Sequence, residues 1–281
     1  MSDSNTNIRR PDWLKIKLDT SEAFQATKEI INSKMLNTVC VEARCPNIYE
    51  CWNRKTATIM ILGDVCTRAC GFCSVKTGKP PIYDTMEPIR VSQAVKKMEL
   101  KHVVVTSVDR DDLRNDYGAS IWADTINQIH LSVPGCSVEV LTPDFKAHIP
   151  SLEKVFNAKP EIFSHNVECV KRISKSVRKQ SNWDRTLEVL KMSVNFGLLT
   201  KTGMMVGLGE TDEEVFEGEN DGQYYPEFYG GVVAVTNAVL KEIEATEDEE
   251  SAINVLATSL GDLIGTASYI LIIWLTYYAL K

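Results

Sequence analysis

Apolar segments of strand length alternate with amphipathic segments of helix length through most of this 281-residue chain. The predicted strands cover residues 58–63, 102–107, 137–141, 162–166 and 198–206. The predicted helices cover residues 21–36, 91–100, 121–131, 150–157, 183–196 and a basic segment that ends at Val177. Strands that alternate with helices favour a parallel sheet with right-handed crossover helices. The order therefore predicts an α/β fold with five strand–helix units before residue 217.

Cysteines are concentrated in one part of the chain, since six of the eight lie between residues 40 and 73. Residues 1–10 are polar and contain no apolar segment typical of a secretion signal, so we expect a cytoplasmic protein. Thiols stay reduced in that compartment, which favours metal binding over disulfides. Cys136 and Cys169 stand apart, and we expect them to be small core residues.

The motif Cys66-x3-Cys70-x2-Cys73, here the downstream triad, follows shortly after the predicted strand 58–63. Three thiolates at this spacing can bind three irons of a 4Fe–4S cluster and leave the fourth iron free to chelate a small molecule. Phe72 is expected to cover a flat ring of that ligand. The alternative is zinc, but structural zinc needs four ligands, usually from two C-x2-C pairs, and no second pair is nearby.

A second motif, Cys40-x4-Cys45-x5-Cys51, here the upstream triad, lies in the predicted loop 38–55. Its three thiolates can also hold a 4Fe–4S cluster, which then needs one more ligand. The alternative is a loop whose cysteines bind no metal, but the presence of two separate triads favours metal. Trp52, next to this motif, is expected to be a packing residue.

These motifs and several longer segments resemble the lipoyl synthase family of the radical S-adenosylmethionine superfamily. The resemblance covers about residues 9–217 and implies a partial (β/α)6 barrel. It rests on RRPDWLKIKL (9–18), CVEARCPNIYECW (40–52), TATIMILGDVCTRACGFCSV (56–75), VVVTSVDRDDL (103–113), FSHNVE (163–168) and GMMVGLGET (203–211).

The resemblance implies an enzyme with two 4Fe–4S clusters and S-adenosylmethionine as cofactors. One electron from the cluster on the downstream triad would cleave S-adenosylmethionine to methionine and a 5′-deoxyadenosyl radical. That radical would remove hydrogen from C6 and C8 of a protein-bound octanoyl-lysine, and each carbon would take sulfur from the auxiliary cluster on the upstream triad. The implied partners are octanoylated lipoyl-carrier proteins (E2 subunits of 2-oxoacid dehydrogenases or the glycine cleavage H protein) and an electron donor such as ferredoxin or flavodoxin.

Several residues at predicted strand ends suit the binding of S-adenosylmethionine, because barrel active sites lie at the carboxyl ends of the strands. The resemblance implies that Ser107 and Asp109 hold the methionine amine or orient the substrate. The alternative is a solvated acidic turn. Asn166 and Glu168 are expected to hydrogen-bond the ribose, whereas His165 is expected to be structural.

Three more residues are candidates for the same cofactor. Arg178 would pair with the methionine carboxylate through its planar guanidinium, unless it is one more solvated charge of a basic helix. Gly207 and Gly209 follow a predicted strand, and they would let the backbone approach the adenine.

The composition changes near residue 218, where the resemblance ends. Residues 1–217 have a net charge of +1, and residues 218–281 have a net charge of −8. We therefore expect an N-terminal arm with the auxiliary-cluster loop (1–55), a barrel core (56–217) and a divergent acidic and apolar tail (218–281). The overall net charge of −7 argues against nucleic acid as a partner.

The tail contains no match to the sixth barrel strand of the family or to its Arg-Ser-Ser-Tyr segment, whose serine completes the auxiliary cluster. Ser268 is followed by Tyr269, but we interpret this match as coincidence. The barrel is therefore expected to lack or alter its last strand. Residues 263–280 are uncharged, and we expect them to form a buried strand or helix of a soluble domain. The alternative is a membrane span, for which the segment is just long enough. The alternative functions are thus a membrane-tethered paralogue that binds clusters without completing sulfur insertion, and a zinc-binding interaction module.

Overall fold

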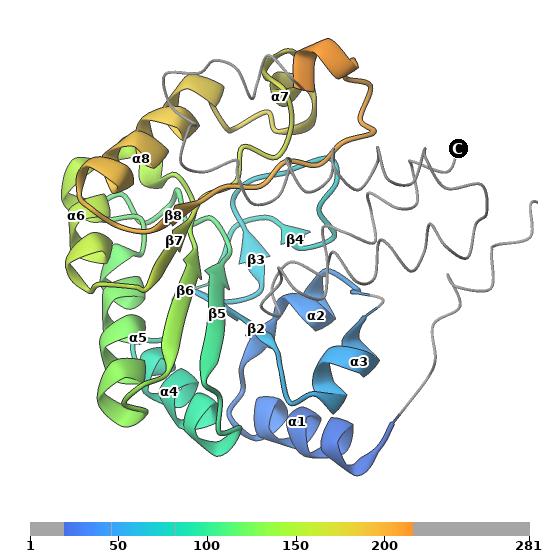
Figure 1. Ribbon diagram of the computed structural model, residues 1–281, viewed down its shortest axis with the longest axis vertical. Coiled ribbons are helices and arrows are strands. Elements are labelled where there is room, and N and C mark those ends of the chain that lie inside the picture. The colour runs from blue at the N-terminus through green and yellow to red at the C-terminus, as the bar shows by residue number, and fades with distance from the viewer. Residues whose placement is uncertain (1–19, 46, 82, 216–281) are drawn as a thin grey trace, which may run out of the picture.

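The computed structural model describes residues 20–45, 47–81 and 83–215, and a mainly parallel sheet forms its centre (Figure 1). Among these residues the sheet has six strands in the order β1-β2-β5-β6-β7-β8. They are β1 (Asn37–Thr38), β2 (Thr58–Ile61), β5 (His102–Ser107), β6 (Ser137–Leu141), β7 (Ile162–Ser164) and β8 (Thr200–Lys201). β1 runs antiparallel to β2, and the other neighbouring strands pair in parallel.

Helices alternate with the parallel strands along the chain. The longer ones are α1 (Glu22–Ser33), α4 (Glu87–Lys97), α5 (Ala119–Ser132), α6 (Ile149–Asn157), α7 (Lys171–Val177) and α8 (Trp183–Asn195). The short elements are α2 (Val39–Glu42), α3 (Ile48–Asn53), the 3-10 helix η2 (Phe145–Ala147) and the strand pair β3 (Val65–Cys66) and β4 (Lys76–Thr77). The parallel sheet with crossover helices confirms the predicted fold class.

The core lies between the sheet and helices α4, α5 and α6, which Figure 1 shows along one side of the strands. Ile59, Val105, Val140 and Phe163 occupy matching register positions on four neighbouring strands, and all four are completely buried. Trp122 of α5 is also completely buried in this core. Each such side chain contributes about 1.5–3 kcal/mol by leaving water, which explains why the strands read as apolar runs.

The opposite face of the sheet carries polar groups at the alternate positions. Glu139 of β6 is buried, and its Oε1 accepts hydrogen bonds from Ser164 Oγ and Lys201 Nζ, each at 3.0 Å. These contacts join three neighbouring strands across the sheet. The carboxylate can be buried because its oxygens have donors.

Most elements agree with the expectation from sequence. Strands 102–107 and 137–141 are observed with the predicted ends, and the strands predicted at 162–166 and 198–206 are shorter. The predicted loop 38–55 is wrong in part, since α2 and α3 form inside it. The Thr38 hydroxyl accepts a hydrogen bond from the backbone N–H of Val41 and so begins α2.

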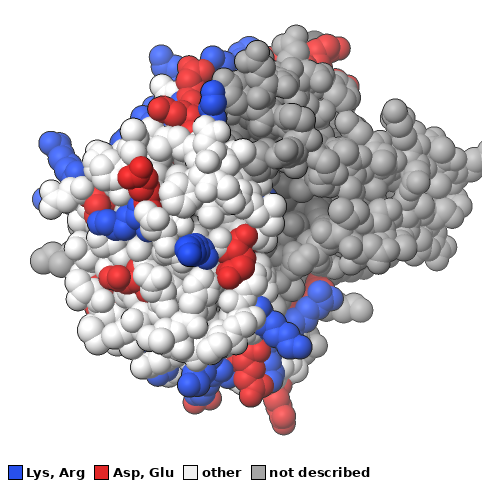
Figure 2. Space-filling model, turned by 60° about the vertical axis from the view of Figure 1, so that its left-hand side comes forward, with Lys and Arg blue, Asp and Glu red and all other residues white. Residues whose placement is uncertain are grey.

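No helix within the described residues is long and apolar enough to cross a membrane. The apolar segment 263–280, Ser268 and the proposed boundary at residue 218 lie outside those residues. Figure 2 turns the helix-covered side of the sheet toward the viewer and shows acidic and basic side chains interspersed on it. That mixture gives this face no strong field of a single sign.

Candidate functional site

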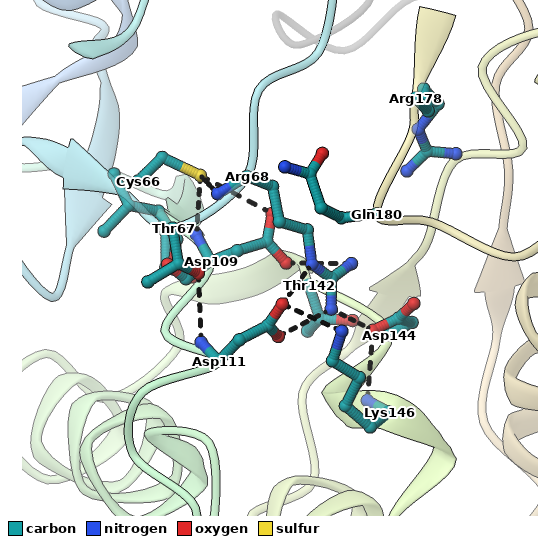
Figure 3. Close-up of polar contacts among 12 residues, drawn as sticks. Cys66, Thr67, Arg68, Asp109, Asp111, Thr142, Asp144, Lys146, Arg178 and Gln180 are labelled. Atoms are coloured by element: carbon teal, nitrogen blue, oxygen red, sulfur yellow. Dashed lines mark hydrogen bonds and ion pairs between the residues drawn. The ribbon is translucent and has the colours of Figure 1, made fainter. Parts of the chain in front are cut away.

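The functional candidates gather where the parallel strands end, because carboxyl ends of parallel strands meet at one edge of the sheet. The downstream triad follows β2, and Asp109 follows β5. Asp144 follows β6, and Asn166 follows β7. Figure 3 shows the side chains of Cys66, Asp109 and Asp144 around Arg68 at this edge.

Backbone N–H groups surround the first sulfur of the downstream triad. Cys66 Sγ accepts hydrogen bonds from the backbone N–H of Asp109 at 3.3 Å and of Arg68 at 3.4 Å. Burial, and then the Asp109 carboxylate, raise the pKa of the Cys66 thiol to about 12. The negative charge of a thiolate is thus costly here without a cation, and bound iron would supply one.

The three thiols of this triad lie close enough to influence one another. A negative charge on Cys70 raises the pKa of Cys66, and a negative charge on Cys73 raises the pKa of Cys70. Cys73 is exposed, while Cys66 and Cys70 are half-buried. Phe72 is half-buried beside the exposed cysteine. A partly open set of thiols is the arrangement expected for a site that receives both a cluster and a small ligand.

Arg68, between the first two cysteines of the motif, is the centre of a buried ion network (Figure 3). Its guanidinium contacts the carboxylates of Asp109 at 3.2 Å, Asp111 at 2.8 Å and Asp144 at 2.6 Å. The bond to Asp111 is bidentate, since Nε also donates to it at 2.9 Å. Asp144 accepts a further hydrogen bond from Arg185 Nε at 2.8 Å.

This network fixes the cysteine loop to the ends of β5 and β6. Burial disfavours the charge of Asp144, but hydrogen bonds and attraction from Arg68 overcome it and hold the pKa of that carboxyl far below its usual value. Burial also disfavours the charge of Arg68. The three carboxylates around the guanidinium outweigh that effect, so the pKa of Arg68 is raised. Sequence reasoning missed Arg68 and Asp144. The available signal was an arginine placed between cysteines directly after a buried strand.

Ser107 and Asp109 lie where the sequence predicted, at the end of β5. The Ser107 hydroxyl donates to the carbonyl of Val108 at 2.8 Å. Asp109 is half-buried, and burial raises its pKa against the opposing charge of Arg68. Its Oδ1 makes no hydrogen bond with the described residues. Asp109 is thus no solvated turn residue, because its Oδ1 forms an ion pair with Arg68 at 3.2 Å.

Arg178 lies beside the second cysteine of the downstream triad. The backbones of Cys70 and Arg178 form an isolated antiparallel bridge. Burial raises the pKa of the Cys70 thiol, and the charge of Arg178 is the main opposing effect. Arg178 Nη1 donates to the carbonyl oxygens of Asn166 at 3.4 Å and Val167 at 3.2 Å. Its Nε is buried and has no partner among the described residues. Arg178 is therefore not a solvated charge on the surface of a basic helix.

Asn166 and Glu168 lie just beyond β7, as predicted. Glu168 has the left-handed φ of 67° and pairs its backbone with Met204. Glu168 is half-buried, and burial raises its pKa despite the nearby charge of Arg178 and a hydrogen bond from Asn166. A Cβ atom at Gly203 would lie 3.0 Å from Asn166 Oδ1, so a larger residue there would have to displace this amide slightly.

The backbone at Gly207 and Gly209 adopts the left-handed region, with φ of 96° and 103°. The Glu210 carboxylate accepts hydrogen bonds from the backbone N–H groups of Gly207 and Leu208 and so holds this turn. The surroundings of His165 agree with the prediction that it is a structural residue. Its Nδ1 lies 2.8 Å from the Thr142 carbonyl, and burial lowers its pKa to about 4.

The upstream triad lies at the other end of β2. β1 runs antiparallel to β2, and its last residue, Thr38, pairs with Ile59. The chain therefore runs toward the amino end of β2 as it reaches Cys40. Cys40 belongs to α2 and Cys51 to α3, and Cys45 lies between these helices. The two triads therefore flank a strand of four residues, about 13 Å long.

The upstream thiols also influence one another. Burial, and then the charges of Cys40 and Cys45, raise the pKa of Cys51 to about 11. Cys40 and Cys45 are themselves buried. No group of three or more metal-ligating side chains within the described residues converges on a single metal ion.

The chain matches known proteins over most of its length. Residues 60–217 match the family model described as the radical SAM superfamily. A lipoyl synthase from Rubrobacter xylanophilus is 53% identical over 208 residues, which are 73% of this chain and 64% of that protein. Lipoyl synthases from Shouchella clausii and Parabacteroides distasonis are each 50% identical, over 76% and 75% of this chain and 70% and 75% of their own lengths. The chain thus spans slightly less than two thirds of the first of these relatives.

Solved structures resemble the chain more distantly. The crystal structure of methylornithine synthase aligns with a TM-score of 0.46 and 13% sequence identity, over 58% of this chain and 49% of that one. A structure of HydG, a maturase of the [FeFe]-hydrogenase, aligns with a TM-score of 0.44 and 15% identity, over 55% of this chain and 36% of that one.

Proposed function

Because the chain belongs to the radical SAM superfamily and, within it, to the lipoyl synthase family, we propose that it is a radical sulfurtransferase that forms the lipoyl group. The proposed reaction inserts sulfur at C6 and C8 of a protein-bound octanoyl-lysine. The proposed cofactors are two 4Fe–4S clusters and S-adenosylmethionine. The observation that carries the proposal is the presence of two separate thiol triads, one at each end of β2.

The residues present fit two iron–sulfur clusters. Burial raises the pKa of all three upstream thiols and of Cys66 and Cys70 in the downstream triad, and this cost of ionisation is relieved when iron binds the thiolates. When bound, the downstream cluster supplies one electron to S-adenosylmethionine, and the upstream cluster supplies sulfur. The fourth ligand of the upstream cluster is not among the assigned residues.

Residues around the downstream triad would hold S-adenosylmethionine. Arg178 offers an unpaired Nε to the methionine carboxylate. The Asp109 carboxylate would accept a hydrogen bond from the methionine amine, with Ser107 at the same strand end. Asn166 and Glu168 would hydrogen-bond the ribose hydroxyls.

The other contacts to this cofactor are apolar or backbone contacts. Phe72 would pack against a ring of the ligand, and the turn at Gly207 and Gly209 would allow the backbone to approach the adenine. The proposed protein partners are an octanoylated lipoyl-carrier protein, either an E2 subunit or the glycine cleavage H protein, and a ferredoxin or flavodoxin as electron donor.

Metal analysis and an activity assay on the full chain test this function. We expect about eight irons and eight sulfides per chain after anaerobic reconstitution, because each triad binds one cluster. Incubation with dithionite, S-adenosylmethionine and an octanoylated carrier protein should add two sulfur atoms to the carrier, as measured by mass spectrometry. Four irons without sulfur transfer would leave only the S-adenosylmethionine site, and bound zinc would overturn the proposal.

A further inference from the structure

Trp52 carries a buried N–H group directed at the upstream triad. The side chain is 3% exposed. Burial raises the pKa of the Cys40 thiol, and N–H groups of the Thr58 backbone and the Trp52 indole partly offset that effect. The indole nitrogen is nevertheless buried without a hydrogen bond of normal geometry to any described residue. The Cys40 sulfur, which this N–H influences, is therefore a candidate acceptor.

The position of the indole ring is fixed from several sides. The Trp52 ring lies 5.2 Å from the ring of Phe24, which in turn stacks on Tyr49 at 5.4 Å. The Trp52 carbonyl accepts a hydrogen bond from Thr27 Oγ1 at 2.9 Å. Both Phe24 and Thr27 belong to α1 and are buried. Helix α1 thus holds the indole N–H in one place, and the ring cannot turn away to find water.

Asn47 provides a second donor in the same loop. Burial raises the pKa of the Cys45 thiol. A hydrogen bond from the backbone N–H of Asn47 partly offsets that effect. Its side-chain nitrogen Nδ2 is buried without a partner among the described residues. Asn47 begins α3, yet its side chain makes no capping hydrogen bond to that helix. The side chain therefore does not perform the usual task of an asparagine at this position.

We propose that Trp52, assisted by Asn47, donates an N–H···S hydrogen bond to the iron–sulfur cluster on Cys40, Cys45 and Cys51. Trp52 is a positioning residue of that cluster rather than a packing residue alone. The inference rests on the proposed function, because it requires a cluster on this triad.

The proposal explains why an unpaired donor is tolerated here. A buried N–H without an acceptor costs about 1–3 kcal/mol, and cluster sulfur relieves that cost because its charge makes it the better acceptor. Hydrogen bonds to cluster sulfurs stabilise the more negative, reduced state and so raise the reduction potential. They also hold the ligands in place against loss of iron.

Trp52→Phe tests the inference, because it removes the N–H and keeps most of the ring. The experiment uses the full chain with Cys66, Cys70 and Cys73 replaced by alanine, so that all bound iron lies on the upstream triad. Trp122→Phe is the matched control. Its indole nitrogen is also buried without a partner, but Trp122 lies in the core of α5. Potentiometry and iron transfer to a chelator are the two measurements.

We expect Trp52→Phe to shift the midpoint potential of the cluster to a more negative value and to speed iron loss about 10-fold or more. Trp122→Phe should change neither quantity. If the parent binds four irons and Trp52→Phe matches it in both measurements, the inference is wrong while the proposed cluster stands. A parent without a cluster would overturn the proposed function itself.

A second measurement on the unaltered Trp52 covers the case in which Trp52→Phe fails to fold. In protein labelled with ¹⁵N in the tryptophan indole, pulsed electron paramagnetic resonance of the reduced cluster should detect one coupled nitrogen. Asn47→Ser, which shortens the second donor, should leave that coupling in place and speed iron loss to a smaller extent. The absence of any coupled indole nitrogen would overturn the inference.

Discussion

Arg68 Nη2 lies 2.6 Å from Asp144 Oδ1, and the side chains of both residues are almost completely buried. The two residues are 76 positions apart in the sequence. Their ion pair fastens the loop of the downstream triad to the end of β6. A buried pair of this kind is costly to break from one side, because the remaining charge has no water to solvate it.

Asp144→Asn should therefore lower the free energy of unfolding by about 3 kcal/mol. It should also lower the occupancy of the downstream cluster, since the loop between Cys66 and Cys70 loses its attachment. Denaturant unfolding and iron analysis measure the two effects. Asp184→Asn is the control, because the Lys171–Asp184 pair is exposed on both sides and should contribute less than about 1 kcal/mol. Equal losses in the two variants would contradict this interpretation.

Cys70→Ala should abolish the cleavage of S-adenosylmethionine while leaving four irons on the upstream triad. The two triads lie at opposite ends of β2, so the loss of one ligand set should not disturb the other. Chromatographic assay of 5′-deoxyadenosine and metal analysis measure the outcome. A variant that retains no iron at all would show that the two sites depend on each other.

Cys45→Ala should spare the reductive cleavage of S-adenosylmethionine but stop sulfur insertion. The proposed sulfur source is the upstream cluster, and Cys45 is one of its three buried or half-buried thiols. Product formation on an octanoylated carrier, followed by mass spectrometry, measures sulfur insertion, and 5′-deoxyadenosine measures cleavage. Lipoyl product above a no-enzyme control would refute this division of labour.

The metal-free protein should become less stable as the pH falls from 7 to 5, because of His165. Burial lowers the folded-state pKa of His165 to about 4, below the ordinary value of about 6.5 for the unfolded chain. The unfolded chain thus binds the proton first. The stability from neutral His165 is fully present above pH ~6.5 and is lost as the pH falls toward ~4.

The expected loss between pH 7 and 5 is about 2 kcal/mol, or a decrease of roughly 4–8 °C in melting temperature. His165→Gln removes the titrating ring, so thermal unfolding of this variant should depend less on pH over the same interval. Glu87, Asp109 and Glu168 have raised pKa values and remain in both proteins, so the difference between them isolates His165. Identical pH profiles would show that His165 does not carry the effect.

Local pattern was enough to predict most of the parallel strands, because their buried positions favour short apolar segments between turn residues. Strands 102–107 and 137–141 accordingly have their predicted ends. The same argument did not detect α2 and α3 around Cys40 and Cys51. These helices have four and six residues, too few for a periodic pattern to stand out from a loop.

Local spacing also identified both cysteine triads, since the ligands of each one lie within twelve residues along the chain. The chain by itself thus determined the α/β order of elements, the two candidate cluster sites and the family. Only the tertiary structure decided which distant groups surround those sites. Arg68 meets Asp144 because β2 and β6 end at the same edge of the sheet, and Trp52 faces Cys40 because α1 packs its ring in place. Such contacts depend on how strands and helices pack in space, and the order of residues does not record that packing.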